Sequence, residues 1–508
     1  MSTTTTPETG DPTPATSGLL RELGPFDATM IVMGAMIGSG IFITSAESAR
    51  MVGSPGWLLV AWALAGLMTI AGAVSAAEIA AMMPRAGGQY VFLREAYSPM
   101  FGFLFGWAMF LVVQTGTIAA VAVAFAKFLG VFWPSISASS YLIEPIQFQG
   151  FGASLSTQQF VGLVLIAGLT AVNMLGLRLG KWIQNSFTFT KTAALLGLIV
   201  LGLAIGWNTE ATAWTSSWWD SSANGWDPSK AIRDQPLSGP LAMPMLLGLA
   251  LIGPLFSQSA WNNVTFTGAE TRDPGRSLPL ALIVGCSVVV GLYLLANVAY
   301  IVTLPFGTIQ HAPEERVGTA ALEAILGPAG ERVMAGAILI STFGCVNGLI
   351  LAGARIYYAM ARDGLFFRAV ARTNRFRVPA VALLAQGLWA SLLVLPVTFS
   401  DDGQGGMKPG NLYGELLEYV IPVDVTFYAL MVGGVVAMRR RAPLMERPYR
   451  TIAYPLPILV YIGIAVLLVV DFVYLKTGTS GKGFLIVLAG IPVYLAWSRT
   501  AQARSSAS

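Results

Sequence analysis

Apolar stretches alternate with short polar loops along almost the whole chain of 508 residues. A helix needs about 20 consecutive apolar residues to cross the hydrocarbon core of a bilayer, and stretches of roughly that length recur twelve times. The expected fold class is therefore an all-α polytopic membrane protein with 12 transmembrane helices. We place these at 27–50, 57–83, 99–133, 158–178, 186–206, 242–267, 278–304, 331–361, 379–399, 411–438, 452–475 and 483–499.

Glycines interrupt the first of these stretches near its middle. Residues 33–42 read MGAMIGSGIF, so Gly38 and Gly40 flank Ser39. Glycine costs about 1 kcal/mol in a helix interior relative to alanine, which makes this the weakest part of the helix. An unwound turn in the membrane survives only where protein or a water-filled cavity satisfies its main-chain groups, and its unbonded N–H groups suit a carboxylate. The alternative interpretation is a glycine-rich face for close helix packing.

The sixth stretch is interrupted as well. Pro254 has no main-chain N–H to donate, and several polar side chains follow it at membrane depth, namely Ser257, Gln258, Ser259, Asn262 and Asn263. Two interrupted helices five spans apart are typical of transporters built from inverted repeats, with the binding site at the membrane midplane. The pair therefore favours a binding site for a small zwitterion over simple packing.

Other polar residues inside the spans are further candidates. An isolated lysine such as Lys191, in the fifth span, is unfavourable unless it snorkels to the interface, binds carbonyl oxygens or loses its proton. We expect its ammonium to occupy a place where another transporter would hold a cation and to tether the unwound first span, with snorkelling as the alternative. Asp424, in the tenth span, is a candidate proton-titrating or gate residue. Three residues of the eighth span could face the first break or simply bond between helices: Ser341, Thr342 and Asn347.

Charged residues at the ends of the spans predict the topology. Of the 30 Lys and Arg residues, 19 lie in loops on one side, nine on the other and two within spans. The positive-inside rule then places both termini in the cytoplasm. Glu78 and Glu270, at the inner ends of spans two and six, are expected to form inner-gate ion pairs with basic residues nearby: Arg85, Arg94 or Arg272.

The same pattern predicts the domain organisation. Residues 1–20, rich in Thr, Pro, Ser and Gly, are expected to be a disordered cytoplasmic tail. The transporter core covers 21–440, with inverted repeats at about 27–206 and 242–438. Helices eleven and twelve occupy 441–500, and 501–508 form a cytoplasmic C-terminal tail.

Composition excludes several function classes. Only 11% of residues are charged and the mean hydropathy is +0.66, whereas soluble proteins have about 25% charged residues. The net charge of +4 belongs to membrane topology, so no nucleic-acid partner is expected. The single histidine, His311, leaves almost nothing for a metal site or a catalytic triad, so we expect neither an enzyme nor a cofactor. Cys286 and Cys345 lie in apolar segments and offer no disulfide to an ancillary subunit.

Several motifs match a known family. They are Gly34–Phe42, Ala77–Tyr90, Phe256–Asn263, Glu270–Pro274 followed by Leu278–Pro279, Arg355–Gly364 and Arg447–Arg450. Over about 20–475 the chain resembles the amino acid–polyamine–organocation superfamily, in its L-type amino acid transporter-like branch. The resemblance implies a LeuT-type five-plus-five inverted repeat, with discontinuous helices 1 and 6 and alternating access for amino acids.

The resemblance also implies roles for the residues at the two breaks. Main-chain N–H groups around Ser39 and Gly40 would bind the substrate carboxylate, and carbonyls near Ile37, Phe256 and Ser259 would bind its ammonium. Phe256 matches the aromatic outer gate, and Lys191 matches the lysine that such permeases place at a sodium position. The full set expected to bind substrate is Ile37, Gly38, Ser39, Gly40, Phe256, Ser257, Ser259 and Ala260, with Lys191, Phe256, Thr342, Asn347 and Asp424 in gating or coupling.

The sixth span departs from the family pattern at three positions, where Gln258, Ser259 and Ala260 stand in place of a tyrosine, an aspartate and a glycine. Ala260 narrows the space beside the substrate side chain, and Gln258 replaces an aromatic residue. Animal members of this branch pair with a single-span glycoprotein through an extracellular cysteine, which this sequence lacks, so we expect the chain to work alone.

The sequence thus predicts a permease for neutral L-amino acids in the cell (inner) membrane, working by exchange or uniport, with amino acid and membrane lipid as its partners. One alternative is a proton-coupled symporter in which Lys191 or Asp424 titrates. The other is a permease for cationic amino acids or polyamines. That permease would need a carboxylate in the pocket, and Asp424 is the only candidate.

Overall fold

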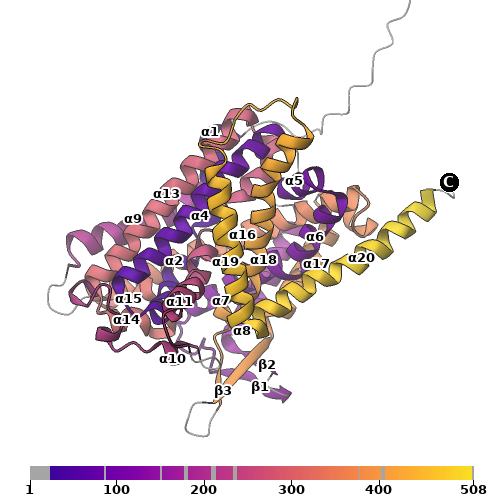
Figure 1. The fold of residues 1–508 in the computed structure, drawn as a ribbon. Helices are drawn as coiled ribbons and strands as arrows, with labels where there is room; N and C mark the ends of the chain where they lie inside the picture. The colour runs from indigo at the N-terminus through magenta and orange to yellow at the C-terminus, as the bar shows by residue number, and fades with distance from the viewer. Residues whose placement is uncertain are drawn as a thin grey trace, which may run out of the picture.

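A computed structural model describes residues 23–84, 87–148, 151–176, 181–207, 213–232, 237–376, 378–401 and 407–505. The tail expected at 1–20 lies outside these residues, and the helix at the other end is described as far as 505. The described chain is a bundle of long helices (Figure 1). All-α polytopic architecture is therefore confirmed.

Span one comprises α1 (Pro25–Met36), α2 (Gly40–Ile43) and α3 (Ser45–Val52), span two is α4 (Pro55–Met82), and span three comprises α6 (Pro99–Ala108), the π-helix η1 (Met109–Val113) and α7 (Gln114–Leu129). Span four is α8 (Thr157–Met174) and span five is α9 (Lys181–Ala204). Span six comprises α11 (Ala242–Ala250), α12 (Ile252–Ser257) and the 3-10 helix η4 (Trp261–Glu270). Spans seven to twelve are α13 (Pro274–Thr303), α16 (Pro328–Arg362), α17 (Ala380–Val394), α18 (Leu412–Arg441), α19 (Leu456–Leu475), and the π-helix η7 (Thr477–Gly481) with α20 (Lys482–Ser505). Shorter helices lie between the spans: α5 (Gln89–Ala96), α10 (Pro228–Ala231), α14 (Phe306–Gln310), α15 (Val317–Leu326), and the 3-10 helices Ala213–Thr215, Ser222–Asn224, Pro313–Glu315 and Arg368–Ala371.

Eleven of the helical segments in the described chain are long and apolar enough to cross a membrane. The remaining expected span, predicted at 379–399, is the 15-residue helix α17. It is shorter than predicted because the chain turns into a β-strand at Pro396, which has no N–H for a further helical turn. The third span ends as a helix at Leu129 rather than at 133, and five residues of π-helix at Met109–Val113 account for part of its length.

The packing of the spans agrees with a five-plus-five repeat. Span two packs against seven (α4 and α13), three against eight (α7 and α16), and four against nine (α8 and α17). In a five-plus-five repeat, each span of one half has its equivalent five positions away in the other half. The contact between spans one and five (α1 and α9) therefore corresponds to that between six and ten (α12 and α18), and both are present. The contact between spans three and ten likewise corresponds to that between eight and five, and both are present. The two halves therefore pack in equivalent ways.

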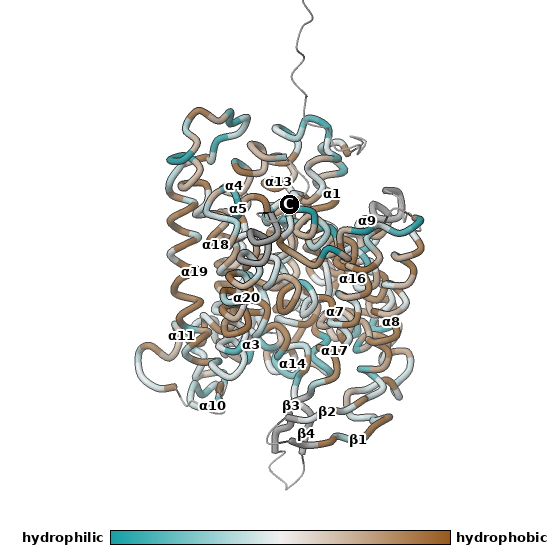
Figure 2. Tube along the Cα trace, turned by 90° about the vertical axis from the view of Figure 1, so that its right-hand side faces the viewer, coloured by the Kyte–Doolittle hydropathy of each residue, from teal (hydrophilic) through white to brown (hydrophobic). Residues whose placement is uncertain are grey.

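A small antiparallel sheet lies at one end of the bundle and was not predicted from the sequence. Its strands are in the order β1 (Tyr141–Phe148), β2 (Phe151–Ser156), β3 (Pro396–Asp401) and β4 (Met407–Pro409). In β2 and β3, Ala153 pairs with Pro396 and Phe151 with Thr398. The sheet joins the loop after span three to the loop after span nine at the lower end of the bundle (Figure 2).

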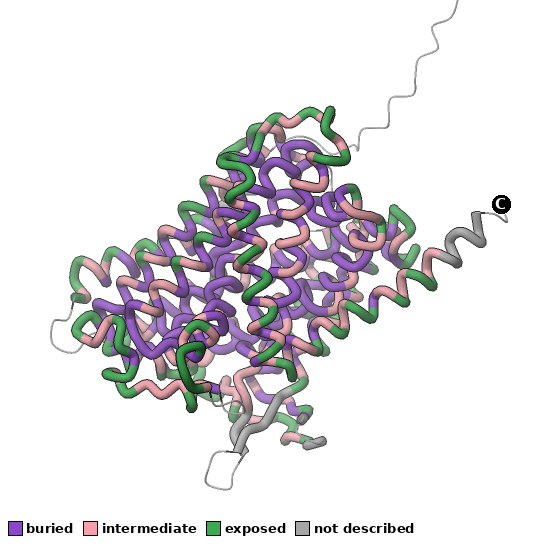
Figure 3. Tube along the Cα trace, in the orientation of Figure 1, coloured by how far each residue is buried: buried purple, intermediate pink, exposed green. Residues whose placement is uncertain are grey.

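Burial follows the pattern expected of a protein in lipid. The sides of the helices that face one another are buried, and the outward sides of the outer helices are exposed (Figure 3). On α19 the exposed residues include Leu459, Leu467 and Val470. Helices that are apolar on their exposed side as well as on their buried side belong in a bilayer. A polar binding site is therefore expected in the interior of the bundle.

Candidate functional site

The first span is broken at the glycine-rich segment, as predicted. Helix α1 ends at Met36, the chain becomes extended at Ile37 with φ −73° and ψ 93°, and the four-residue helix α2 starts at Gly40. A break of this kind frees the carbonyls of the last α1 turn and the N–H groups of the residues that follow. Each of these groups needs a partner, because there is no water in the hydrocarbon core.

Three of the freed carbonyls accept hydrogen bonds from side chains of other spans. The Lys191 ammonium, on α9, donates to the carbonyl of Gly34. The Tyr293 hydroxyl, on α13, donates to Met36 O at 2.9 Å, and the Ser341 hydroxyl, on α16, lies 3.5 Å from Ile37 O. Lys191 is only 3% exposed, so it does not snorkel to the interface. It contacts the first span, as predicted.

Other main-chain groups of the break have no such partner. Within the described part of the chain, no acceptor binds the N–H groups of Ser39, Gly40 and Ile41, and no donor binds the carbonyl of Ala35. Three consecutive amides and a nearby carbonyl are therefore available to a ligand. A carboxylate accepts two or three N–H bonds of this kind readily.

The sixth span is broken at the predicted place too. Helix α12 ends at Ser257, and the 3-10 helix η4 begins after Ala260, whose φ of 64° is in the left-handed region. Glycine adopts that conformation without strain, whereas another residue loses roughly 1–2 kcal/mol. Ala260 therefore adopts under strain a turn that a glycine would adopt freely.

Side chains hold the sixth-span break in place from several directions. The Ala260 N–H donates to the Tyr428 hydroxyl at 3.2 Å, and that hydroxyl donates to Asn262 Oδ1 at 3.0 Å. The Tyr428 ring stacks on Trp261 with centroids 4.9 Å apart. On the other side of the break, the Ser48 hydroxyl donates at 2.8 Å to the carbonyl of Ala250, which Pro254 cannot serve. The carbonyls of Ser257, Gln258 and Ser259 have no donor in the described chain.

The two breaks touch each other. A Cβ atom on Gly40 would lie 2.8 Å from Ser257 Cβ and 2.9 Å from Ser257 Cα, so only glycine permits this approach. Next to it, the hydroxyl oxygens of Thr44 and Ser257 are 3.2 Å apart. The segment with the available amides and the segment with the available carbonyls therefore lie side by side.

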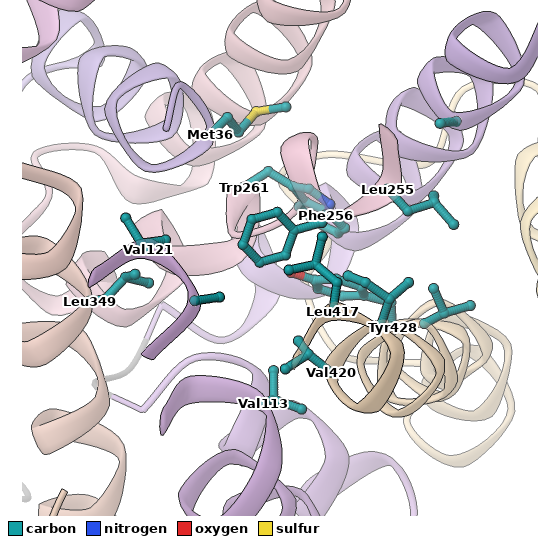
Figure 4. Packing of buried hydrophobic residues seen from close by; sticks show 14 of the residues in the cluster. Met36, Val113, Val121, Leu255, Phe256, Trp261, Leu349, Leu417, Val420 and Tyr428 are labelled. Carbon is teal, nitrogen blue, oxygen red and sulfur yellow. The ribbon is translucent and has the colours of Figure 1, made fainter. Parts of the chain in front are cut away.

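An aromatic pair lies beside this region. The rings of Phe256 and Tyr413 meet edge to face with centroids 5.9 Å apart, and the Tyr413 hydroxyl is 3.3 Å from Ser39 Oγ. Figure 4 shows Phe256 in the middle of the view with Trp261 and Leu417 near it. Phe256 of the sixth span thus contacts Tyr413 of the tenth span, which in turn contacts Ser39 in the first break.

Two residues predicted for gating make no hydrogen bond to either break within the described chain. The Thr342 hydroxyl bonds within its own helix, to Ile338 O at 2.8 Å, and the Asn347 side-chain oxygen accepts from Asn173 at 2.8 Å. The bond of Asn347 is the interhelical contact of the alternative interpretation. Ser341, rather than Thr342, lies beside the first break. Asp424 lines a small cavity next to Gln258 and Ser259.

Ion pairs lie at both ends of the bundle. At one end, Glu315 binds Arg50 at 2.6 Å and Lys127 at 3.3 Å. Burial alone raises the pKa of the Glu315 carboxyl, but the charges of Lys127 and Arg50 outweigh burial and hold the pKa below its usual value. At the other end, the fully buried Glu78 accepts from Arg439 at 2.8 and 2.7 Å.

The inner ion pairs are not the ones predicted. Glu78 binds Arg439 and the main chain of Thr451, while Glu270 lies 3.6 Å from Arg355. Arg94 binds Asp363 instead, and Arg85 lies outside the described residues. Sequence proximity to spans two and six suggested near neighbours, but the bundle brings the end of span ten to Glu78.

A larger cavity lies elsewhere. Its volume is about 530 Å³, and it opens between η1, α7, α17, α18 and α20. The lining is mostly apolar and includes Val112, Leu393, Leu416 and Ile486. This apolar lining suits an apolar group better than the two charged ends of an amino acid.

Sequence reasoning missed the tyrosines. Tyr293, Tyr413 and Tyr428 all bond to the broken segments. In an apolar span a tyrosine reads as an ordinary core residue, although its hydroxyl needs a partner when buried. The two unwound segments, in turn, contain main-chain groups that need hydrogen-bond partners. These matching needs are the one feature of the sequence that could have indicated a role for the tyrosines.

Comparison with known proteins agrees with this arrangement. A family model described as amino acid permease matches residues 23–497. The serine/threonine exchanger SteT of Bacillus subtilis is 28% identical over 482 residues, which is 94% of this chain and 97% of that protein. The human b(0,+)-type amino acid transporter 1 is 26% identical, covering 95% of this chain and 88% of its own length. The human large neutral amino acids transporter small subunit 2 is also 26% identical, covering 94% of this chain and 80% of its own length.

The contact between the breaks predicts a difference between two glycines. Gly40→Ala should abolish ligand binding, because the new methyl group would collide with the main chain at Ser257. Gly38→Ala should cost much less, because its nearest atom, Cys345 Sγ, would be 3.4 Å away. Binding can be measured with purified protein and a radiolabelled amino acid. Equal losses for the two variants would contradict the close approach.

The bond between Lys191 and Gly34 predicts a functional loss with limited unfolding. Lys191→Met keeps much of the side-chain volume but leaves a carbonyl of the first break without a donor, which should cost roughly 1–3 kcal/mol locally. Transport should fall far more than the yield of monodisperse protein from detergent. Uptake close to that of the unaltered protein would show that the ammonium does not position the break.

Proposed function

The chain belongs to the amino acid permease family, and from that premise we propose that it carries neutral L-amino acids across the membrane by alternating access, as an exchanger or a uniporter. It is a multi-pass membrane transporter of amino acids. The neutral side chain, the transport mode and the roles of single residues are the parts that we infer.

The available main-chain groups at the two breaks carry the proposal. The amides of Ser39, Gly40 and Ile41 would bind the substrate carboxylate, and the carbonyls of Ala35 and Ser259 would bind its ammonium. Every α-amino acid carries both charges at neutral pH. Recognition through main-chain groups therefore suits a permease that accepts several side chains.

Near these groups, the described residues that bond to the breaks are hydroxyls, amides, aromatic rings and one ammonium. A cationic side chain would need a carboxylate. Asp424 is close to Gln258 and Ser259, but its cavity has a volume of only about 10 Å³. This small size favours neutral substrates. The relatives named as a serine/threonine exchanger and a transporter of large neutral amino acids support the same choice.

The position of Lys191 argues against sodium coupling. Its ammonium already binds a carbonyl of the first break, which is the kind of oxygen that a sodium ion would need. We expect uptake that does not depend on Na⁺.

We also expect both termini in the cytoplasm, from the distribution of basic residues. Cys286 and Cys345 are both buried. Neither is placed to join an ancillary subunit, so the chain should transport by itself.

The proposed function predicts amino acid exchange by the purified protein alone. Proteoliposomes loaded with an unlabelled neutral amino acid should take up labelled neutral amino acids, and uptake should be the same in Na⁺ and in choline. Empty liposomes and lysine or putrescine as substrates are the controls. A protein that moves none of the neutral amino acids, or only the cationic compounds, would refute the proposal.

The role of the Ser39 amide can be separated from that of its hydroxyl. Ser39 has φ −76°, which proline adopts without strain, so Ser39→Pro removes one N–H donor with little change in the backbone. Binding should fall at least tenfold, about 1.4 kcal/mol, the size of one charge-assisted hydrogen bond. Ser39→Ala loses only the contact with Tyr413 and should bind more tightly than the proline variant. The reverse order would rule out carboxylate binding by this amide.

A further inference from the structure

A small cavity lies between α4, the sixth-span break, α18 and α19. Its volume is about 10 Å³, which is close to the least that can hold one water molecule. The polar residues that line it are Thr69, Gln258, Ser259, Asp424, Tyr428 and Tyr461. It adjoins the break in the sixth span and shares Ser259 with the main-chain set that would bind the amino acid, whereas Gln258 and Asp424 are not part of that set.

Gln258 presents an unsatisfied acceptor here. Its side chain is 1% exposed, and its amide nitrogen donates to the carbonyl of Trp62 at 3.4 Å. Its oxygen, Oε1, is buried and has no hydrogen-bond donor in the described chain. A buried acceptor without a hydrogen bond costs roughly 1–3 kcal/mol. Gln258 Oε1 therefore requires a donor, which no side chain of the described chain provides.

Asp424 presents a second set of acceptors at the same cavity. The residue is 8% exposed, and no described residue donates a hydrogen bond to its carboxyl group. Among the described residues, no Lys, Arg or His lines the cavity. The titratable groups that face Asp424 are Tyr428 on its own helix and Tyr461 on α19, while α4 and the sixth span present Thr69, Gln258 and Ser259. An ionised carboxylate in such surroundings would be a buried charge without a partner, which proteins avoid.

A single bound proton can remove both the unsatisfied acceptor at Gln258 and the buried charge at Asp424. We propose that Asp424 binds a proton and, as a neutral carboxylic acid, donates a hydrogen bond to Gln258 Oε1, directly or through one water molecule in the cavity. The reaction is simple proton binding, in which a carboxylate and a proton give the acid. No charge then remains in the cavity, and the orphaned oxygen of Gln258 has its donor.

This inference rests on the proposed function and adds a pH dependence to it. Gln258 is the first residue after α12 and lies within the broken segment. When Asp424 loses its proton, the donor to Gln258 disappears and a charge remains beside the break. The packing of the sixth span against α18 is then weakened, so the proton stabilises the arrangement of the break that this structure shows. A transport cycle that includes this arrangement should require a protonated Asp424.

A first experiment detects the proton without measuring transport. Purified protein is titrated in detergent while infrared difference spectra are recorded. The unaltered protein should show the carbonyl stretch of a buried carboxylic acid that disappears at alkaline pH, and Asp424→Asn should lack this band. Gln258→Met should keep the band but lose it at lower pH, because the neutral acid has lost its acceptor. A spectrum unchanged by Asp424→Asn would overturn the proposal.

A second experiment links the proton to transport in proteoliposomes. Uptake by the unaltered protein should fall by up to about tenfold per pH unit above the midpoint of the infrared titration, and Asp424→Asn should flatten this profile. Asp471→Asn is the matched control, because Asp471 is an acidic residue in the next span that does not line the cavity. It should keep the pH profile.

Three results would refute the proposal: a flat profile in Asp471→Asn instead, a normal profile in Asp424→Asn, or uptake that requires Na⁺ rather than protons. A protein that transports no amino acid would refute the proposed function, while the infrared titration would still decide whether Asp424 holds a proton.

Discussion

The structure depends on one constraint: a main-chain N–H or C=O in the middle of a bilayer must have a partner, because no water is there to supply one. An unbroken helix meets this requirement by itself. Two spans of this protein do not, and their freed groups have to be bonded by side chains from elsewhere in the bundle. Several of the polar residues in the interior can be understood from this requirement.

The side-chain partners come from spans far apart in the sequence. Lys191, Tyr293 and Ser341 bond to carbonyls of the first span, and Ser48 and Tyr428 bond to groups of the sixth. What they leave unbonded is a set of amides on one broken segment and a set of carbonyls on the other. In the function that we propose, these unbonded groups form the binding site, and a zwitterion is the ligand whose two charges would match them.

The ion pairs at the two ends of the bundle complete this picture. Glu315 with Arg50 and Lys127 lies on one side of the breaks, and Glu78 with Arg439 lies on the other. Alternating access requires each side to open in turn, and partly exposed ion pairs are suited to this because they exchange with water at small net free energy. Glu78 is fully buried and also binds Thr451, so its cluster should be the harder one to open.

The sequence alone determined where the helical spans lie, both breaks and the presence of a lysine inside the fifth span, because each of these is local; the ninth span, α17, is shorter than predicted. Glycines on either side of Ser39, a proline before a run of polar residues and a lysine within an apolar stretch act on the helix that contains them. Tertiary structure decided which partners meet: the tyrosines at the breaks, Arg439 at Glu78 and Ser341 in place of Thr342. It also decided the sheet that joins the loops after spans three and nine. A hydroxyl or a charge in a span must find a partner somewhere, but only the packing of distant helices determines which one it meets.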